Sequence, residues 1–311
     1  SLGFLSGGSK GSTTNALVQA GLDAMKDLEG NFVVPLFSRN ASLDVAAGLT
    51  DTNSTYDIAS INAAVRSHCL EMSKLKQKKW RRGLCSYKGT FADAKDVAGN
   101  LANDRISCLF QDVIDTDSLG TLKTFQPWMG AVKAAAMQAA GFYKDITHKY
   151  INISGASCTG YDPNLVSAVE SALDAGLLPI TKDNGGFKWV SDQTTYGADD
   201  NFVYNSLQAG YGVDLIMGTT VRRMERAFIG QSLADVDAAT GKTVFGAIME
   251  DLKRLKLVAG DDEAPAGYKN LVIKIRNGNA MLVNVEIKEA TSLKFVLVQF
   301  LVQAITQTAT G

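Results

Sequence analysis

The feature that most constrains the fold of this chain is a change of hydrophobic period in its last third, residues 201–303. Apolar residues first recur at helical spacing, over residues 203–228 and again over 244–257. The period then becomes two, at Leu271, Ile273, Ile275, Val283, Val285 and Ile287. The turn sequence Arg276-Asn277-Gly278-Asn279 separates the two alternating runs, so this stretch predicts a β-hairpin.

A further apolar run, residues 293–298, follows the hairpin and predicts one more strand. Two strands and a tail bury little apolar surface by themselves, and open sheet edges recruit other chains. We therefore interpret residues 201–311 as an assembly domain. The predicted inter-subunit residues are the six alternating hairpin residues, Phe295 and Leu297 of the last strand, and Arg223 and Arg226 of the long helix. For the two arginines, solvation at the surface is the alternative.

The first two thirds of the chain alternate strand and helix patterns. Strands are predicted at residues 32–37, 84–87, 106–113 and 187–190, and helices at 15–28, 58–75, 91–102, 128–140 and 162–175, the last with Asp162 as its cap and Pro163 as its first residue. This order is typical of a parallel sheet with crossover helices. The predicted fold class is α/β: a parallel or mixed sheet domain with crossover helices at residues 1–200, followed by an α+β domain with a β-hairpin at 201–311.

Charge and hydropathy exclude two classes of partner. The 31 basic and 32 acidic residues leave a net charge of -1, without the broad positive field that binds nucleic acid. The one basic cluster, residues 74–82, is interpreted as a solvated helix end, with a charged contact to another subunit as the alternative. Because the longest apolar candidate, residues 295–305, is short and interrupted by glutamines, no membrane insertion is predicted.

No constellation of residues argues for catalysis, a cofactor or a metal. The Gly-rich stretch at residues 7–13 is not a phosphate loop, since Lys10 precedes Gly11 instead of following it. The four cysteines form no C-x-x-C pair, and His68 and His148 lack the neighbours that nucleophilic catalysis needs. The chain is therefore predicted not to be an enzyme. The alternative is an α/β nucleotide-binding enzyme, which rests on the strand–helix alternation and the Gly-rich start.

Several stretches together point to a family. They are Leu5–Gly11 before a helix, Asn31–Leu36, the Ala-rich Trp128–Ala140, Ala172–Gly176, Gly185–Val190, Asp192–Tyr196 and Asp214–Gly230, which contains the dipeptides Arg222-Arg223 and Glu225-Arg226. In this order the chain resembles the tail sheath proteins of contractile bacteriophages and related contractile injection machines. The divergence of each stretch suggests a large-genome phage.

The resemblance implies a structural subunit. Sheath subunits stack in rings around an inner tail tube, attach to a baseplate, and contract to drive the tube through the host envelope. The implied partners are other copies of the chain, the tube protein and the baseplate, and the implied location is the virion, with assembly in the host cytoplasm. Terminal arms of such proteins add strands to a neighbour's hairpin; here residues 271–287 would be that hairpin and 293–302 the donated strand. The chain starts at the Gly-rich stretch and is expected to lack the family's N-terminal arm. A static protein of the same virion is the alternative.

Overall fold

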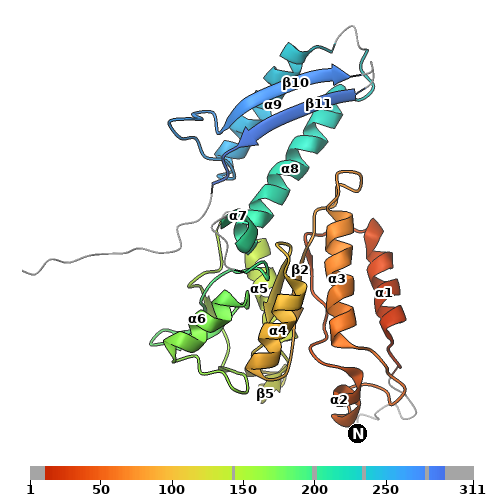
Figure 1. Cartoon of the computed structure of the whole chain (residues 1–311), viewed down its shortest axis with the longest axis vertical. Coiled ribbons are helices and arrows are strands. Elements are labelled where there is room, and N and C mark those ends of the chain that lie inside the picture. Colours follow the sequence, from red (N-terminus) through yellow and green to blue (C-terminus); the bar gives the residue numbers. More distant parts are fainter. Residues whose placement is uncertain (1–10, 142–143, 198–201, 233–235, 277–279, 291–311) are drawn as a thin grey trace, which may run out of the picture.

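The computed structural model describes residues 11–141, 144–197, 202–232, 236–276 and 280–290. The molecule is elongated, and the long helix α8 joins two folded parts (Figure 1). We call residues 11–197 the α/β part. The second part, the hairpin unit, consists of α8 (Leu207–Phe228), α9 (Ala238–Arg254), β10 (Tyr268–Arg276) and β11 (Ala280–Ile287).

A three-stranded parallel sheet organises the α/β part. Its strands, in spatial order, are β1 (Phe32–Val33), β2 (Arg82–Ser86) and β3 (Ile106–Leu109), and its helices are α1 (Asn15–Ala24), α3 (Ile58–Met72) and α4 (Phe91–Leu101). The helices begin where the sequence supplies caps, because Asp57 accepts a hydrogen bond from the Ser60 N–H and Thr90 forms a capping box with Asp93. Every residue of β2 and β3 is buried, as expected for parallel strands with helices on their faces.

Two antiparallel sheets complete the α/β part. They have the orders β5-β4-β7 and β6-β9-β8. The remaining elements are η1 (Met25–Asp27), α2 (Ala41–Ala46), β4 (Asp112–Thr116), β5 (Leu122–Phe125), α5 (Trp128–Ala140), β6 (Tyr150–Ile151), β7 (Gly155–Ser157), α6 (Val166–Asp174), β8 (Ile180–Asp183), β9 (Gly186–Trp189) and α7 (Phe202–Asn205). Trp189 is fully buried in the core that α5 shares with β3 and β4. The α/β class, the parallel sheet and the terminal hairpin are as predicted.

Two predicted strands differ from the structure. Residues 106–113 were expected as one strand, but they divide into β3 and β4, which belong to different sheets. Gln111 lies at the break and pairs with the backbone of Ile180: its Nε2 donates to the carbonyl at 2.9 Å, and its Oε1 accepts from the N–H at 2.6 Å. The strand predicted at 32–37 ends after Val33, because Pro35 has no N–H to continue a ladder.

Two predicted helices also differ. The helix expected from Asp162 begins at Val166, because Asp162 accepts from the N–H of Asn164 at 2.9 Å and forms a local turn instead of a cap. The long helical pattern 203–228 is two helices, α7 and α8, separated at Ser206. The Ser206 hydroxyl caps α8 by accepting from the N–H of Ala209, and it donates to buried Asp192 at 2.6 Å.

The basic cluster at residues 74–82 is not a solvated helix end throughout. Trp80, Arg81 and Arg82 are buried, with at most 5% of each residue exposed. Arg81 donates to the carbonyls of Met25 and Leu28, and Arg82 pairs with Asp214 of α8. The cluster therefore joins the two parts of the molecule. In the part of the chain that the structure describes, no helix combines the length and the apolar character needed to cross a bilayer.

Candidate inter-subunit interface

Among the described residues, β10 and β11 form a sheet of two strands, whereas the other sheets have three. The strands pair from Tyr268 with Ile287 to Arg276 with Ala280, and among the described residues neither strand pairs with a third one in a sheet. Each strand therefore has an outer edge whose backbone groups face away from its partner. Such an edge is a template for strand addition by another chain.

The predicted hairpin residues lie on one side of the hairpin, because Ile275 is two residues after Ile273 and pairs with Met281, which packs on the same core. Leu271, Ile273, Val283, Val285 and Ile287 pack into the core formed with α8 and α9, whereas 38% of Ile275 is exposed. The apolar face thus holds the hairpin on its own helices. What the hairpin can offer another chain is its two backbone edges and its outer face, where Val272 and Leu282 are exposed. Phe295 and Leu297 lie outside the described residues.

The two predicted arginines lie in the second half of α8. Arg223 forms an ion pair with Asp251 of α9, with 2.6 Å between Nη2 and Oδ2. Arg226 is exposed in the last turn of the helix. Glu225, between these two arginines in the sequence, pairs with Lys78 of the α/β part. A contact of either arginine with another subunit stays a prediction.

Close packing on α9 fixes the position of the hairpin. Gly241 faces Ile273, where a Cβ atom would lie 3.2 Å from two of its side-chain carbons. A bulge between Lys269 and Val272 bends β10; Asn270, in the bulge, has φ 56°, and its side chain donates to Glu286 at 2.8 Å. The hairpin is therefore held in one register and one orientation.

A buried charge cluster anchors α8 to the α/β part. Both oxygens of Asp214 accept from Arg105 at 2.9 Å, and Oδ2 also accepts from Arg82 Nε at 3.0 Å. Only 2% of the Asp214 side chain and 3% of the Arg82 side chain are exposed. Since an unpaired charge is costly at such depth, the cluster holds α8 in a fixed place against β2 and β3.

Glycines on α8 allow the neighbouring side chains to approach its backbone. A Cβ at Gly210 would lie 2.2 Å from the Arg82 guanidinium, and one at Gly218 would lie 3.2 Å from the Trp80 ring. The ring of Tyr211 packs on Phe32 of β1, with 4.8 Å between centroids. Lys78 pairs with Glu225 further along the helix. The helix that packs against the hairpin is thus in contact with the α/β part along most of its length.

The carboxyl group of Glu289 lies where the chain leaves the hairpin. A Cβ at Gly212 would lie 2.3 Å from Glu289 Oε1, so α8 can pass the side chain only because this residue is glycine. Both carboxyl oxygens are buried and make no hydrogen bond to any residue that the structure describes. Burial raises the pKa of Glu289 to about 8, although nearby Arg82 opposes the shift.

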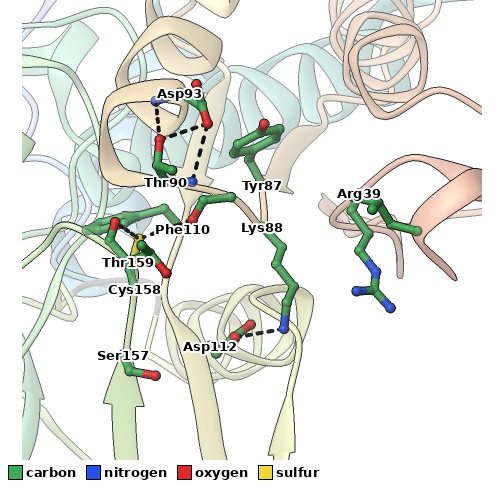
Figure 2. A pocket seen from close by; sticks show the side chains of 12 residues that line it. Arg39, Tyr87, Lys88, Thr90, Asp93, Phe110, Asp112, Ser157, Cys158 and Thr159 are labelled. Atoms are coloured by element: carbon green, nitrogen blue, oxygen red, sulfur yellow. Dashed lines mark hydrogen bonds and ion pairs between the residues drawn. The ribbon is translucent and has the colours of Figure 1, made fainter. Parts of the chain in front are cut away.

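A pocket at the carboxyl ends of β2 and β3 tests the alternative of a nucleotide-binding enzyme. This edge of a parallel sheet is where α/β proteins bind ligands, and the cavity of about 660 Å³ includes the start of α4 (Figure 2). However, the Asp93 carboxylate already accepts from Thr90 at the start of α4, in the place where a phosphate would bind. Lys88 is paired with Asp112 at 2.7 Å, so this edge does not favour an anion.

The pocket also lacks an activated nucleophile among its described residues. Its thiol, Cys158, has a pKa raised by burial to about 11, so the sulfur is protonated at neutral pH. Cys69, Cys85 and Cys108 are fully buried, and burial raises the pKa of each thiol. His68 Nε2 faces the Arg81 guanidinium at 2.6 Å, and burial lowers the pKa of His68. Neither histidine lines this pocket.

Sequence comparison finds no relatives, whereas the fold has many. No protein-family model matches the chain, and no curated protein is significantly similar in sequence. The sheath tail protein Lin1278 of Listeria innocua matches 93% of this chain with a TM-score of 0.66 and 15% identity. The baseplate structure of the anti-feeding prophage matches 93% with a TM-score of 0.61, and its contracted helical sheath matches 78% with a TM-score of 0.54, each at 12% identity.

The chain therefore has a tail sheath fold, and the resemblance seen in the sequence is confirmed at that level. It spans 60% of the Listeria protein, 74% of the chain in the baseplate and 66% of the chain in the helical sheath. The neighbours are structural proteins of contractile assemblies.

Proposed function

We propose that this chain is a structural subunit of a contractile tail sheath, which polymerises helically around an inner tail tube and drives the tube through a host envelope. The observation that carries the proposal is the hairpin, which has two open edges and is set on a helix that the α/β part holds fixed. The sheath fold supports it.

The chemistry of strand addition suits such a machine. An added strand makes main-chain hydrogen bonds along the whole edge, and these bonds can persist while the attached bodies change orientation. In this proposal residues 293–302 of one copy add to residues 271–287 of the next. Because the giving and receiving segments differ, the contact is heterologous and its repetition produces an open helix.

Contraction in this proposal needs no bound fuel and no catalytic residue. The extended sheath is a metastable assembly, and its energy is stored in the contacts between subunits. The anchored helix α8 transmits the movement, because the Asp214 cluster joins the hairpin unit to the α/β part. Besides other copies, the proposed partners are the inner tube and the baseplate, in a phage virion assembled in the host cytoplasm.

Electron microscopy of the full-length protein tests the proposal. We expect hollow tubes of uniform width, either from the concentrated protein alone or when the inner tube protein is added as a template. Tubes of two lengths, with a shorter and wider second form, separate a contractile sheath from a static virion protein. Monodisperse particles under both conditions would overturn the proposal.

A further inference from the structure

The turn between β4 and β5 displays leucines to the solvent. Leu119 is 86% exposed, more than any other large hydrophobic residue in the described part of the chain, and Leu122 is 58% exposed. Both lie on a two-stranded projection of the α/β part, far along the chain from the C-terminal hairpin. Neither contributes to a described hydrophobic core cluster.

Hydrogen bonds hold this turn, residues 117–121, in one conformation. Asp117 Oδ1 accepts from the N–H groups of Leu119 and Thr121, each at 2.9 Å. Asp117 Oδ2 pairs with Lys123 of β5 at 2.6 Å, so the charge of Asp117 is neutralised. Gly120 supplies the positive φ, 76°, that closes the turn. A preorganised turn that presents an apolar side chain loses little conformational entropy when it binds.

An apolar groove lies elsewhere on the same part, between α1 and residues 33–37. We call it the α1 groove. Its volume is about 470 Å³, and none of its twelve lining residues is charged. Leu22, Val33 and Val65 form its buried floor, and Leu17 and Leu36 are 57% and 58% exposed at its rim.

The groove is open above α1. Gly21 lines it, and no atom of the described residues lies within 4 Å of the position that a Cβ atom would take there. A branched apolar side chain therefore has room to enter, whereas a charged one would find no partner.

We propose that the 117–121 turn of one copy docks, through Leu119, in the α1 groove of a neighbouring copy. The inference rests on the proposed self-assembly and adds a second joint, independent of the hairpin edges. The turn adjoins β5 and the groove adjoins α1, and these two elements lie apart in the α/β part (Figure 1). A contact between them is heterologous, so it propagates along a helix instead of closing a dimer.

Cysteine cross-linking tests this contact directly. In a Cys158→Ser background only fully buried native thiols remain. We expect Leu119→Cys combined with Leu36→Cys to give a covalent ladder when assembled tubes are oxidised. The matched control is Leu119→Cys with Leu165→Cys, because Leu165 is 54% exposed at the start of α6 and does not line the groove. Normal tubes that give no ladder, or an equal ladder from the control, would overturn the proposal.

Filling the groove provides a second test that does not involve the turn. Gly21→Phe places a ring in the groove, and Gly99→Phe places one on α4, where again no described residue comes within 4 Å of a Cβ atom. We expect both monomers to keep the wild-type circular dichroism spectrum, and only Gly21→Phe to raise the protein concentration needed for assembly. Equal assembly of the two variants would contradict the docking.

These outcomes separate the docking from the proposed function. If tubes form, Gly21→Phe assembles like the wild type and oxidation gives no ladder, the docking is wrong and the proposal of a sheath subunit still stands. A Leu119→Cys cross-link to the inner tube protein alone would show that the neighbouring copy is the wrong occupant. If no assembly forms with or without the tube protein, both proposals fail together.

Discussion

The α/β part and the hairpin unit bury their strands in different ways. Every residue of β2 and β3 is buried, whereas the residues of β11 alternate strictly between exposed and half-buried. The parallel strands are enclosed by helices, and the hairpin is a single layer with helices on one face and solvent on the other. The α/β part is therefore enclosed, and the hairpin unit is where the described residues leave strand edges unpaired.

Proline substitutions in the hairpin should give the largest effect on assembly. Successive residues of an antiparallel strand point their N–H groups alternately at the partner strand and outward. Of the neighbouring variants Asn284→Pro and Val285→Pro, one therefore removes an inner donor and the other an outer one. The variant that loses the outer donor should be the more stable of the two in urea, because its bonds within the hairpin are intact. We expect this variant to lose polymerisation nonetheless. The same holds for Lys274→Pro and Ile275→Pro on the other strand. If the more stable variant of each pair forms tubes, the hairpin edges are not the joint.

Removing the carboxylate that anchors α8 should give the largest loss of monomer stability. Asp214→Ala leaves the guanidinium groups of Arg82 and Arg105 without their shared partner, and we expect about 3–5 kcal/mol less free energy of unfolding. The matched control is Asp251→Ala, because Asp251 also pairs with two arginines but its side chain is 31% exposed, and we expect a much smaller loss. Urea denaturation followed by tryptophan fluorescence measures both losses. Similar losses would contradict the anchoring of the hairpin unit through Asp214.

Glycine-to-alanine substitutions should have opposite signs in the two parts. At Gly83 of β2 a Cβ atom would lie 2.7 Å from Ile106 and 2.8 Å from Val65, so Gly83→Ala should destabilise by about 1–3 kcal/mol. At Gly246 of α9 the nearest atom is 3.6 Å away, so Gly246→Ala should stabilise by about 0.5–1 kcal/mol through helix propensity. Thermal unfolding of the two variants checks the signs. Destabilisation by Gly246→Ala would mean that α9 packs more tightly than this comparison implies.

The pH dependence of stability should carry a contribution from Glu289. Its pKa is raised by burial from 4.5 to about 8, so the folded chain holds a proton that the unfolded chain releases between these values. The free energy of unfolding should therefore fall as the pH rises through this window and level off above it, with a slope of at most about 1.4 kcal/mol per pH unit. Glu289→Gln should remove this contribution; an unchanged difference between pH 6 and pH 8 would show that Glu289 is already charged in the folded chain.

Much of the fold could be predicted from local patterns. The hairpin followed from the alternation of Leu271, Ile273 and Ile275, and the parallel sheet from the order of strands and helices. The missed features depend on contacts far along the chain. The break between β3 and β4 depends on Gln111 bonding with Ile180, and the break before α8 on Asp192 accepting from Ser206.

The candidate interface was harder to predict than the fold. An alternating strand shows which residues share a face, but not whether that face meets the chain's own helices or another subunit. The structure turns Leu271, Ile273, Val283, Val285 and Ile287 toward α8 and α9. The anchoring of α8 was not foreseen either, since Arg82 and Asp214 are separated by 132 residues and each was part of an unremarkable local pattern.

Hydrogen–deuterium exchange of the hairpin amides, in the monomer and in assembled tubes, tests the edge-addition joint most directly. We expect the outward-facing amides of β10 or β11 to exchange quickly in the monomer and to become protected in tubes, while those of β2 and β3 are protected in both. Protection that appears on assembly elsewhere, with both hairpin edges exchanging as fast as in the monomer, would contradict a sheath joined through this hairpin.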